Sequence, residues 1–144
     1  MPLFSASSLR FGKTTQTVRD GSLGKVLSAE TFSPVNLEPT HPELFWYGIH
    51  GVEALYTLMG TGCETVSRVK AGNYDIATGV WKNGRVGAYR GIVKGKADFG
   101  AVAYGSKAIG QAAKAVSYEG LCRQIGKFFR TGETPVSAEE TIEI

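Results

Sequence analysis

Cysteine and histidine are scarce in this sequence, which has two of each among its 144 residues. Cys63 and Cys122 lie far apart without a C-x-x-C spacing, so a zinc site is not expected. His41 and His50 are too few to build a histidine-based metal site. We therefore expect no metal, and we interpret both cysteines as reduced, buried small hydrophobic residues.

Long hydrophobic runs and an excess of one charge sign are also missing. No apolar stretch approaches the roughly 20 residues that a membrane span requires. The opening MPLFSASSLR lacks the basic flank and apolar run of a signal peptide. The net charge of +3 is too mild to favour nucleic acid. With 42% hydrophobic residues, the chain is predicted to be one globular, cytoplasmic domain with no membrane or nucleic-acid partner.

Nucleotide-binding motifs are absent as well. FGKTT, at Phe11–Thr15, is similar to the end of a P-loop, but Ser7 stands where the first glycine is required. GSKAIGQ has P-loop glycine spacing without the lysine that must follow it. MGTGCET lies at the end of a helical pattern, whereas a dinucleotide loop follows a strand. We expect this chain alone to bind no cofactor.

What is present is a series of strand and helix patterns that do not alternate. Strands are predicted at Lys25–Ser33, Thr65–Lys70 and Ala97–Gly105, and helices at Thr14–Asp20 and from the capping box at Thr40–Glu43 to Gly60. Asn83-Gly84 lies between two β-rich runs and predicts a hairpin with a type I′ turn. Strands clustered in the middle of the chain indicate an α+β fold, with a mostly antiparallel open sheet and helices on one face.

The C-terminal part carries two further helix signals. SYEGLCRQIGKFFRTGE is amphipathic, and Gly132 is predicted to end it. Four of its residues are predicted to face inward: Leu121, Ile125, Phe128 and Phe129. The S-x-x-E capping box at Ser137–Glu140 predicts a last helix, and because the chain stops at Ile144 we interpret that helix as cut short.

The segment from Thr40 to Gly60 raises the functional question. Wound at about 3.6 residues per turn, it buries most of its surface in two apolar stripes. The remaining strip collects four residues: Trp46, Tyr47, His50 and Glu53. Ionisable groups on so apolar a helix are either a satisfied pair at the surface or the edge of an active site.

Several segments resemble the C-terminal domain of the Gfo/Idh/MocA oxidoreductases, the glucose–fructose oxidoreductase and inositol dehydrogenase family. They are FWYGIHGVEALYTLMGTGCETV, GVWKNGRVGAYRG and FRTGETPVSAEETIEI, with SASSLRF and GSLGKV near the start. The resemblance covers nearly the whole chain, and its motifs are specific in combination.

The resemblance implies one half of a two-domain enzyme. An N-terminal Rossmann domain binds NAD or NADP in this family and carries a lysine in an E-K-P motif, and neither is present here. Residues 1–9 are expected to be the remnant of the last Rossmann strand. Residues 10–144 are expected to form the substrate-side and oligomerisation domain, truncated in its last helix.

The resemblance also implies a site. The family helix carries a D-x-x-x-H-x-x-D pattern that faces nicotinamide and substrate, and His50 and Glu53 match its histidine and second acidic position. Trp46 replaces the first acidic residue, and the Tyr47 hydroxyl lies on the same side. We therefore expect His50, Glu53 and Tyr47 to be catalytic.

Three roles have two interpretations each. Glu53 either orients His50 or binds substrate. Trp46 is either a packing wall or a surface on which a sugar stacks. Arg90 is either a solvated strand residue or a substrate-binding residue.

Two functions follow. The first is the substrate-binding half of an NAD(P)-dependent oxidoreductase acting on a sugar, cyclitol or related alcohol, inactive alone because hydride transfer needs the nicotinamide held against the substrate. The second is a stand-alone, non-enzymatic module for oligomerisation or sugar binding. Both predict a homo-oligomer through the uncovered sheet face, and the coding sequence upstream of Met1 distinguishes them.

Overall fold

The computed structural model describes residues 18, 20–36, 38–41, 43–113 and 118–144. Their elements run in the order β1 (Val26–Pro34), η2 (Glu43–Phe45), α2 (Ile49–Met59), β2 (Cys63–Ala71), β3 (Tyr74–Trp81), β4 (Val86–Ile92), β5 (Gly100–Gly105), β6 (Ile109–Ala113), α3 (Glu119–Thr131) and α4 (Ala138–Glu143). The predicted remnant strand at residues 1–9 and most of the predicted helix at Thr14–Asp20 lie outside the described residues.

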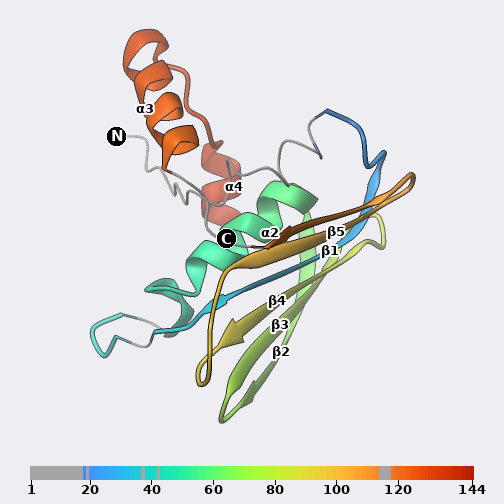
Figure 1. Ribbon diagram of the computed structural model, residues 1–144, viewed down its shortest axis with the longest axis vertical. Coiled ribbons are helices and arrows are strands. Elements are labelled where there is room, and N and C mark those ends of the chain that lie inside the picture. The colour runs from blue at the N-terminus through green and yellow to red at the C-terminus, as the bar shows by residue number, and fades with distance from the viewer. Residues whose placement is uncertain (1–17, 19, 37, 42, 114–117) are drawn as a thin grey trace.

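The six strands form one open sheet in the order β2-β3-β4-β1-β5-β6. β1 runs parallel to β4, and the other neighbouring pairs are antiparallel. Helix α2 crosses one face, where it packs mainly against β1 and β4 (Figure 1). The predicted α+β class with a mostly antiparallel open sheet is confirmed, whereas strand β6 was not predicted.

The hairpin between β3 and β4 is confirmed, but the predicted type I′ turn is wrong. Of its turn residues, Gly84 alone has a positive φ, 75°. Its N–H donates to the Trp81 carbonyl at 2.8 Å, and the Trp81 N–H donates to the Arg85 carbonyl at 2.9 Å. This is a three-residue loop in which a type I turn is followed by a left-handed glycine. Asn83 therefore needs no left-handed backbone.

Helix α2 starts nine residues later than the capping box predicted, at Ile49 instead of Thr40. The Thr40 hydroxyl contacts Glu38 and His41 and does not cap a helix. Glu43 has a φ of 30°, outside the right-handed helical region, and it begins only a short 3₁₀ turn, η2. The helix ends as predicted, because the Gly60 N–H donates to the Tyr56 carbonyl at 2.7 Å.

The core lies between α2 and the sheet, and a close backbone approach shapes it. A Cβ at Gly51 would lie 2.3 Å from the Tyr89 ring, so only glycine permits this contact. Thr31 Oγ1 donates to the Gly51 carbonyl at 2.9 Å, and Ser33 Oγ lies 3.0 Å from the Tyr89 hydroxyl. Burial raises the pKa of that hydroxyl to about 12. The helix is thus fixed to β1 and β4 by apolar packing and by buried hydrogen bonds.

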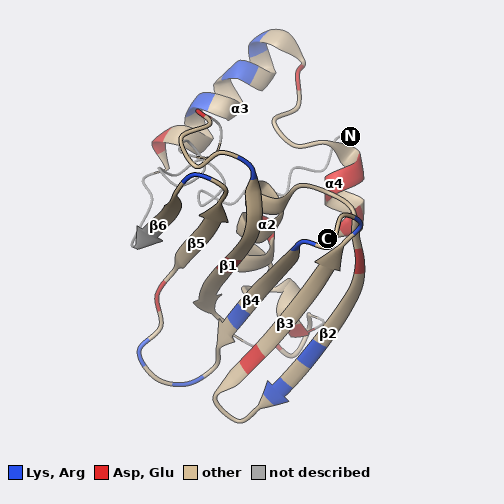
Figure 2. Ribbon diagram, turned by 90° about the vertical axis from the view of Figure 1, so that its right-hand side faces the viewer, with Lys and Arg blue, Asp and Glu red and all other residues tan. Residues whose placement is uncertain are grey.

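The other face of the sheet remains largely apolar and open. Side chains alternate along a strand, so the β4 residues next to Tyr89 face away from α2. Exposed apolar residues on this face come from several strands: Val69, Tyr74, Val80, Val86 and Ile109. Figure 2 shows this face with α2 behind the strands.

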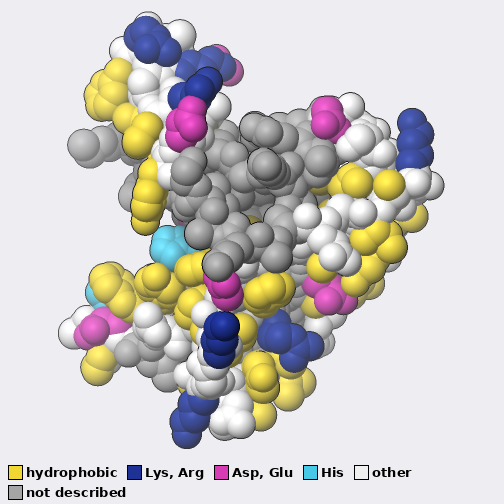
Figure 3. All heavy atoms as spheres, in the orientation of Figure 1, with side chains coloured by type: hydrophobic (Ala, Val, Ile, Leu, Met, Phe, Trp, Pro, Cys, Tyr) yellow, Lys and Arg dark blue, Asp and Glu magenta, His cyan; other side chains and the backbone are white. Residues whose placement is uncertain are grey.

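Helix α3 stands away from the sheet, and its apolar side is not buried (Figure 3). The Phe129 side chain is 81% exposed and Ile125 is 44% exposed, so the predicted inward orientation is wrong for both. Cys122, on the same helix, is exposed as well, contrary to the interpretation as a buried residue. Gly132 ends the helix in the left-handed conformation, as predicted.

Helix α4 is capped as the sequence predicted. The Ser137 hydroxyl accepts a hydrogen bond from the Glu140 N–H at 3.1 Å. The Glu143 carboxylate accepts hydrogen bonds from the N–H groups of Gly62 and Cys63 at 2.8 and 2.7 Å, which joins α4 to the start of β2. No helix in the described part of the chain is long and apolar enough to cross a membrane.

Candidate functional site

The first turn of α2 holds the histidine that the sequence singled out. His50 Nδ1 lies 3.5 Å from Glu53 Oε2, the i, i+3 contact that helical spacing predicts. The His50 side chain is 39% exposed, whereas the Glu53 side chain is 2% exposed. An accessible imidazole is thus backed by a buried carboxylate.

Tyr47 lies beside this pair. Its carbonyl accepts a hydrogen bond from the His50 N–H at 3.3 Å. The two rings meet edge to face with centroids 5.5 Å apart. On its other side Tyr47 contacts Phe99, with ring centroids 6.0 Å apart. Phe99 precedes β5, and no sequence signal pointed to it because only the fold brings it there.

Trp46 extends the aromatic surface before the helix. It lies in the turn that joins η2 to α2, and its side chain is 46% exposed. Its ring contacts the His41 ring, with centroids 4.6 Å apart. Half of its surface thus remains free for a ligand to stack on, at the same end of α2 as His50.

Arg90 lies on the opposite face of the sheet from this cluster. Its neighbour Tyr89 faces α2, and strand alternation turns Arg90 the other way. There its guanidinium carbon lies 5.7 Å from the centre of the Tyr74 ring. The structure therefore brings His50, Glu53 and Tyr47 together with Trp46 nearby, and it does not bring Arg90 to them. We leave Arg90 out of the candidate site.

The geometry suits proton transfer at one imidazole nitrogen. When Nδ1 carries its proton toward Glu53, the carboxylate fixes that tautomer and leaves Nε2 as the acceptor. The Nδ1–Oε2 distance is at the long end of hydrogen bonding, as is common for catalytic contacts before substrate binds. The pair can act as a general base oriented by a buried carboxylate.

The described residues do not form a dinucleotide cradle. Such a cradle is a strand followed by a glycine-rich turn and a helix N-terminus. Helix α2 is instead preceded by η2 and by two bulky aromatic residues, Trp46 and Tyr47. No cluster of three or more His, Cys, Asp or Glu suited to a metal ion occurs in the described part of the chain.

Solved structures with a similar fold include oxidoreductases. A protein assigned as a myo-inositol dehydrogenase from Sinorhizobium meliloti 1021 is similar with a TM-score of 0.73 and 14% identity, over 94% of this chain and 57% of that one. This chain has the fold of inositol dehydrogenase-like oxidoreductases over about half of their length. The likeness predicted from the sequence motifs is thereby confirmed at the level of the fold. No protein-family model and no curated protein sequence matches the chain.

Two further structures were solved with ligands. The scyllo-inositol dehydrogenase from Lactobacillus casei, with bound NAD(H) and scyllo-inositol, matches with a TM-score of 0.66 and 11% identity, over 96% of this chain and 56% of that one. A levoglucosan dehydrogenase in complex with NADH and levoglucosan matches with a TM-score of 0.56 and 13% identity, over 72% of this chain and 37% of that one. In each case this chain spans roughly half the other protein or less.

Proposed function

We propose that this chain is the substrate-side half of an NAD(P)-dependent oxidoreductase that acts on a sugar, cyclitol or related alcohol. The observation that carries the proposal is the half-exposed His50 imidazole, backed by the buried Glu53 carboxylate at the start of α2. The oxidoreductase fold supports it, as do the polyol and anhydrosugar ligands of two proteins that share this fold.

A nicotinamide nucleotide, which another half would have to hold because the described residues form no cradle for it, would supply hydride acceptance at the alcohol carbon. His50 takes the hydroxyl proton at Nε2, while Glu53 holds Nδ1. We assign Glu53 the orienting role rather than substrate binding because its carboxylate is buried. Tyr47 offers a hydroxyl beside the imidazole, and the exposed ring of Trp46 offers an apolar surface for the C–H face of a sugar.

The proposal predicts that the 144-residue chain is inactive alone, since its described residues form no dinucleotide cradle. The partner is a nucleotide-binding half, whether joined in the same reading frame or supplied as a separate chain. A cytoplasmic location stays a prediction from the sequence.

The test compares the purified chain with the product of the complete reading frame that contains it. Reduction of NAD⁺ and NADP⁺ is followed with a panel of cyclitols, aldoses and anhydrosugars. We expect activity in the complete protein alone, with kcat/KM lowered roughly 100-fold or more by His50→Asn and lowered less by Glu53→Gln and Tyr47→Phe. Glu119→Gln, an exposed α3 substitution, is the matched control. Full turnover by the His50→Asn variant would contradict the proposed role of His50. A complete protein that binds polyols without oxidising them would favour the non-enzymatic module.

We also propose that the chain forms a homo-oligomer through the open sheet face. Val69 and Val66 provide a matched test, because both are 66% exposed on β2 but point to opposite faces. We expect Val69→Lys to reduce the mass measured by light scattering, because a desolvated lysine disfavours an apolar interface. Val66→Lys should leave the mass unchanged. A monomeric wild-type chain would contradict this proposal.

A further inference from the structure

A buried carboxylate on the sheet sits at the base of an ion-pair cluster that the proposed chemistry does not use. Asp75, at the start of β3, is 1% exposed on the face that α2 covers. Arg68 on β2 donates to both of its oxygens, from Nε to Oδ1 at 2.7 Å and from Nη2 to Oδ2 at 2.5 Å. This two-bond contact fixes the plane of the guanidinium, because the fork of Arg matches a carboxylate.

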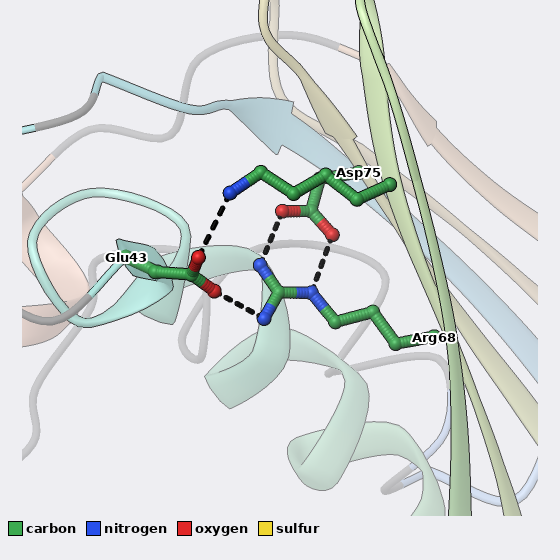
Figure 4. Close-up of polar contacts among 4 residues, drawn as sticks. Glu43, Arg68 and Asp75 are labelled. Carbon is green, nitrogen blue, oxygen red and sulfur yellow. Dashed lines mark hydrogen bonds and ion pairs between the residues drawn. The ribbon is translucent and has the colours of Figure 1, made fainter.

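The remaining guanidinium nitrogen extends the ion-pair cluster toward the residues that precede α2. Its Nη1 forms an ion pair with the Glu43 carboxylate. Lys70, two residues along the same face of β2, donates to Glu43 Oε1 at 2.8 Å. Figure 4 shows Glu43 held in this way, with one cation at each carboxylate oxygen, and shows Asp75 joined by two hydrogen bonds to the same guanidinium. We call Asp75, Arg68, Lys70 and Glu43 the clamp.

The clamp joins the sheet to the residues that lead into the helix, which we call the lead-in segment (residues 43–48). Glu43 is the one described non-glycine residue with a positive φ, and such a conformation persists only where its surroundings hold it. No residue of η2 is fully buried, and Phe45 is 61% exposed, so apolar burial holds η2 weakly. The other anchors of the lead-in segment are Leu44, which packs against the core, Tyr47, whose ring contacts Phe99, and the buried Gly48.

The position of the lead-in segment decides where the aromatic residues of the site lie. Trp46 and Tyr47 follow Glu43 by three and four residues, and the Tyr47 carbonyl accepts the His50 N–H. A shift of Glu43 therefore moves both rings relative to the imidazole. An exposed ion pair on a mobile side chain would not fix such a position, but here the guanidinium is already fixed by buried Asp75.

We propose that the clamp is a positioning device, in which Asp75 fixes Arg68, Arg68 and Lys70 fix Glu43, and Glu43 sets the placement of Trp46 and Tyr47 beside His50. The consequence for substrate rests on the proposed function, whereas the placement itself does not. Asp75, Arg68, Lys70 and Glu43 are positioning residues and touch none of the reacting groups.

The test is Glu43→Gln in the 144-residue chain, read by nuclear Overhauser contacts between side-chain rings. This substitution keeps the shape of the side chain and removes its charge at a half-exposed position, so the fold should survive. We expect loss of the Tyr47–His50 contact, while the core contact between Tyr56 and Trp81, whose ring centroids lie 5.6 Å apart, is retained. Glu119→Gln, which removes a glutamate charge from the exposed Glu119–Arg123 pair on α3, should retain both contacts.

Arg68→Lys is the second variant, because lysine keeps a charge near Asp75 but cannot bridge two carboxylates with a planar fork. It should show the same local loss. Retention of the Tyr47–His50 contact in both variants would overturn the proposal. Loss of the Tyr56–Trp81 contact together with the Tyr47–His50 contact would also overturn it, since the cluster would then be a general structural support. In an active complete protein, Glu43→Gln should raise KM several-fold through Trp46 and should lower kcat no more than Tyr47→Phe does. The ring contacts are read without substrate, so their outcome does not depend on the proposed reaction.

Discussion

Helices α2 and α3 have similar lengths, 11 and 13 residues, and opposite surroundings. Seven residues of α2 are buried, and its backbone approaches the sheet closely enough to need glycine. No residue of α3 is buried, although the helix is strongly amphipathic. An amphipathic pattern thus shows that a helix has an apolar side, but it does not show whether residues of the same chain bury that side.

The largest expected effect is on the buried helix. Leu55, 4% exposed, packs in the core between α2 and the sheet. Leu55→Ala should lower the free energy of unfolding by about 2–5 kcal/mol, because it removes buried apolar surface and leaves a cavity. Urea denaturation followed by circular dichroism measures the change. A loss below about 1 kcal/mol would mean that α2 is not the centre of this core.

A matched pair of glycine substitutions sharpens the comparison. A Cβ at Gly51 on α2 would lie 2.3 Å from the Tyr89 ring, so Gly51→Ala should destabilise the chain by about 1–3 kcal/mol. On α3, a Cβ at Gly126 would meet only the end of the Arg130 side chain, at 3.7 Å. Gly126→Ala should therefore stabilise the chain by about 0.5–1 kcal/mol through helix propensity. If both substitutions changed the free energy of unfolding in the same direction, the contrast between α2 and α3 would be contradicted.

Acid should weaken the attachment of the segment that leads into α2. Hydrogen bonds from Lys70 and Arg68 lower the pKa of Glu43 below its ordinary value of 4.5. A lowered folded-state pKa contributes stability above the unfolded value, and that contribution is lost as the pH falls through the folded value. Unfolding measured from neutral pH downward should therefore show a smaller acid loss in Glu43→Gln than in the wild-type chain. Equal losses of stability at low pH in the two proteins would show that the ion pairs of Glu43 do not stabilise the folded chain.

The smallest effect is expected on the exposed helix. The Phe129 side chain is 81% exposed, so Phe129→Ser should change the free energy of unfolding by no more than about 0.5 kcal/mol. The thermal midpoint of the 144-residue chain is the measurement. A loss as large as that of a core residue would show that the apolar side of α3 is covered within this chain.

Local patterns predicted those elements that local physics determines. The strand at β1 follows from local strand propensity. The hairpin at Asn83-Gly84, the left-handed end at Gly132 and the cap at Ser137 follow from the turn or capping preferences of a few neighbouring residues. The start of α2 was mispredicted because Thr40 and Glu43 have capping-box spacing, yet Glu43 is held by cations from β2 that are distant in sequence.

In the candidate site, too, local contacts were predictable from the sequence, whereas features that depend on the fold were not. His50 and Glu53 are i, i+3 neighbours, so their contact was predictable from helical spacing. Arg90 lies on the opposite face of the sheet from them, and the sequence could not predict this because strand alternation does not reveal which face α2 covers. Phe99 reaches Tyr47 only through tertiary packing, and Asp75 reaches Arg68 through the pairing of β2 with β3, so no local pattern indicated these contacts.

The central claim is that the buried Glu53 carboxylate holds the His50 imidazole with one nitrogen free for proton transfer. The most direct measurement is the ¹H–¹⁵N correlation spectrum of the imidazole, which reports its tautomer, in the wild-type chain and in Glu53→Gln. We predict that His50 carries its proton on Nδ1 in the wild-type chain and that this preference is lost in the variant. The same tautomer in both proteins would show that Glu53 does not orient His50, and it would contradict the proposed site.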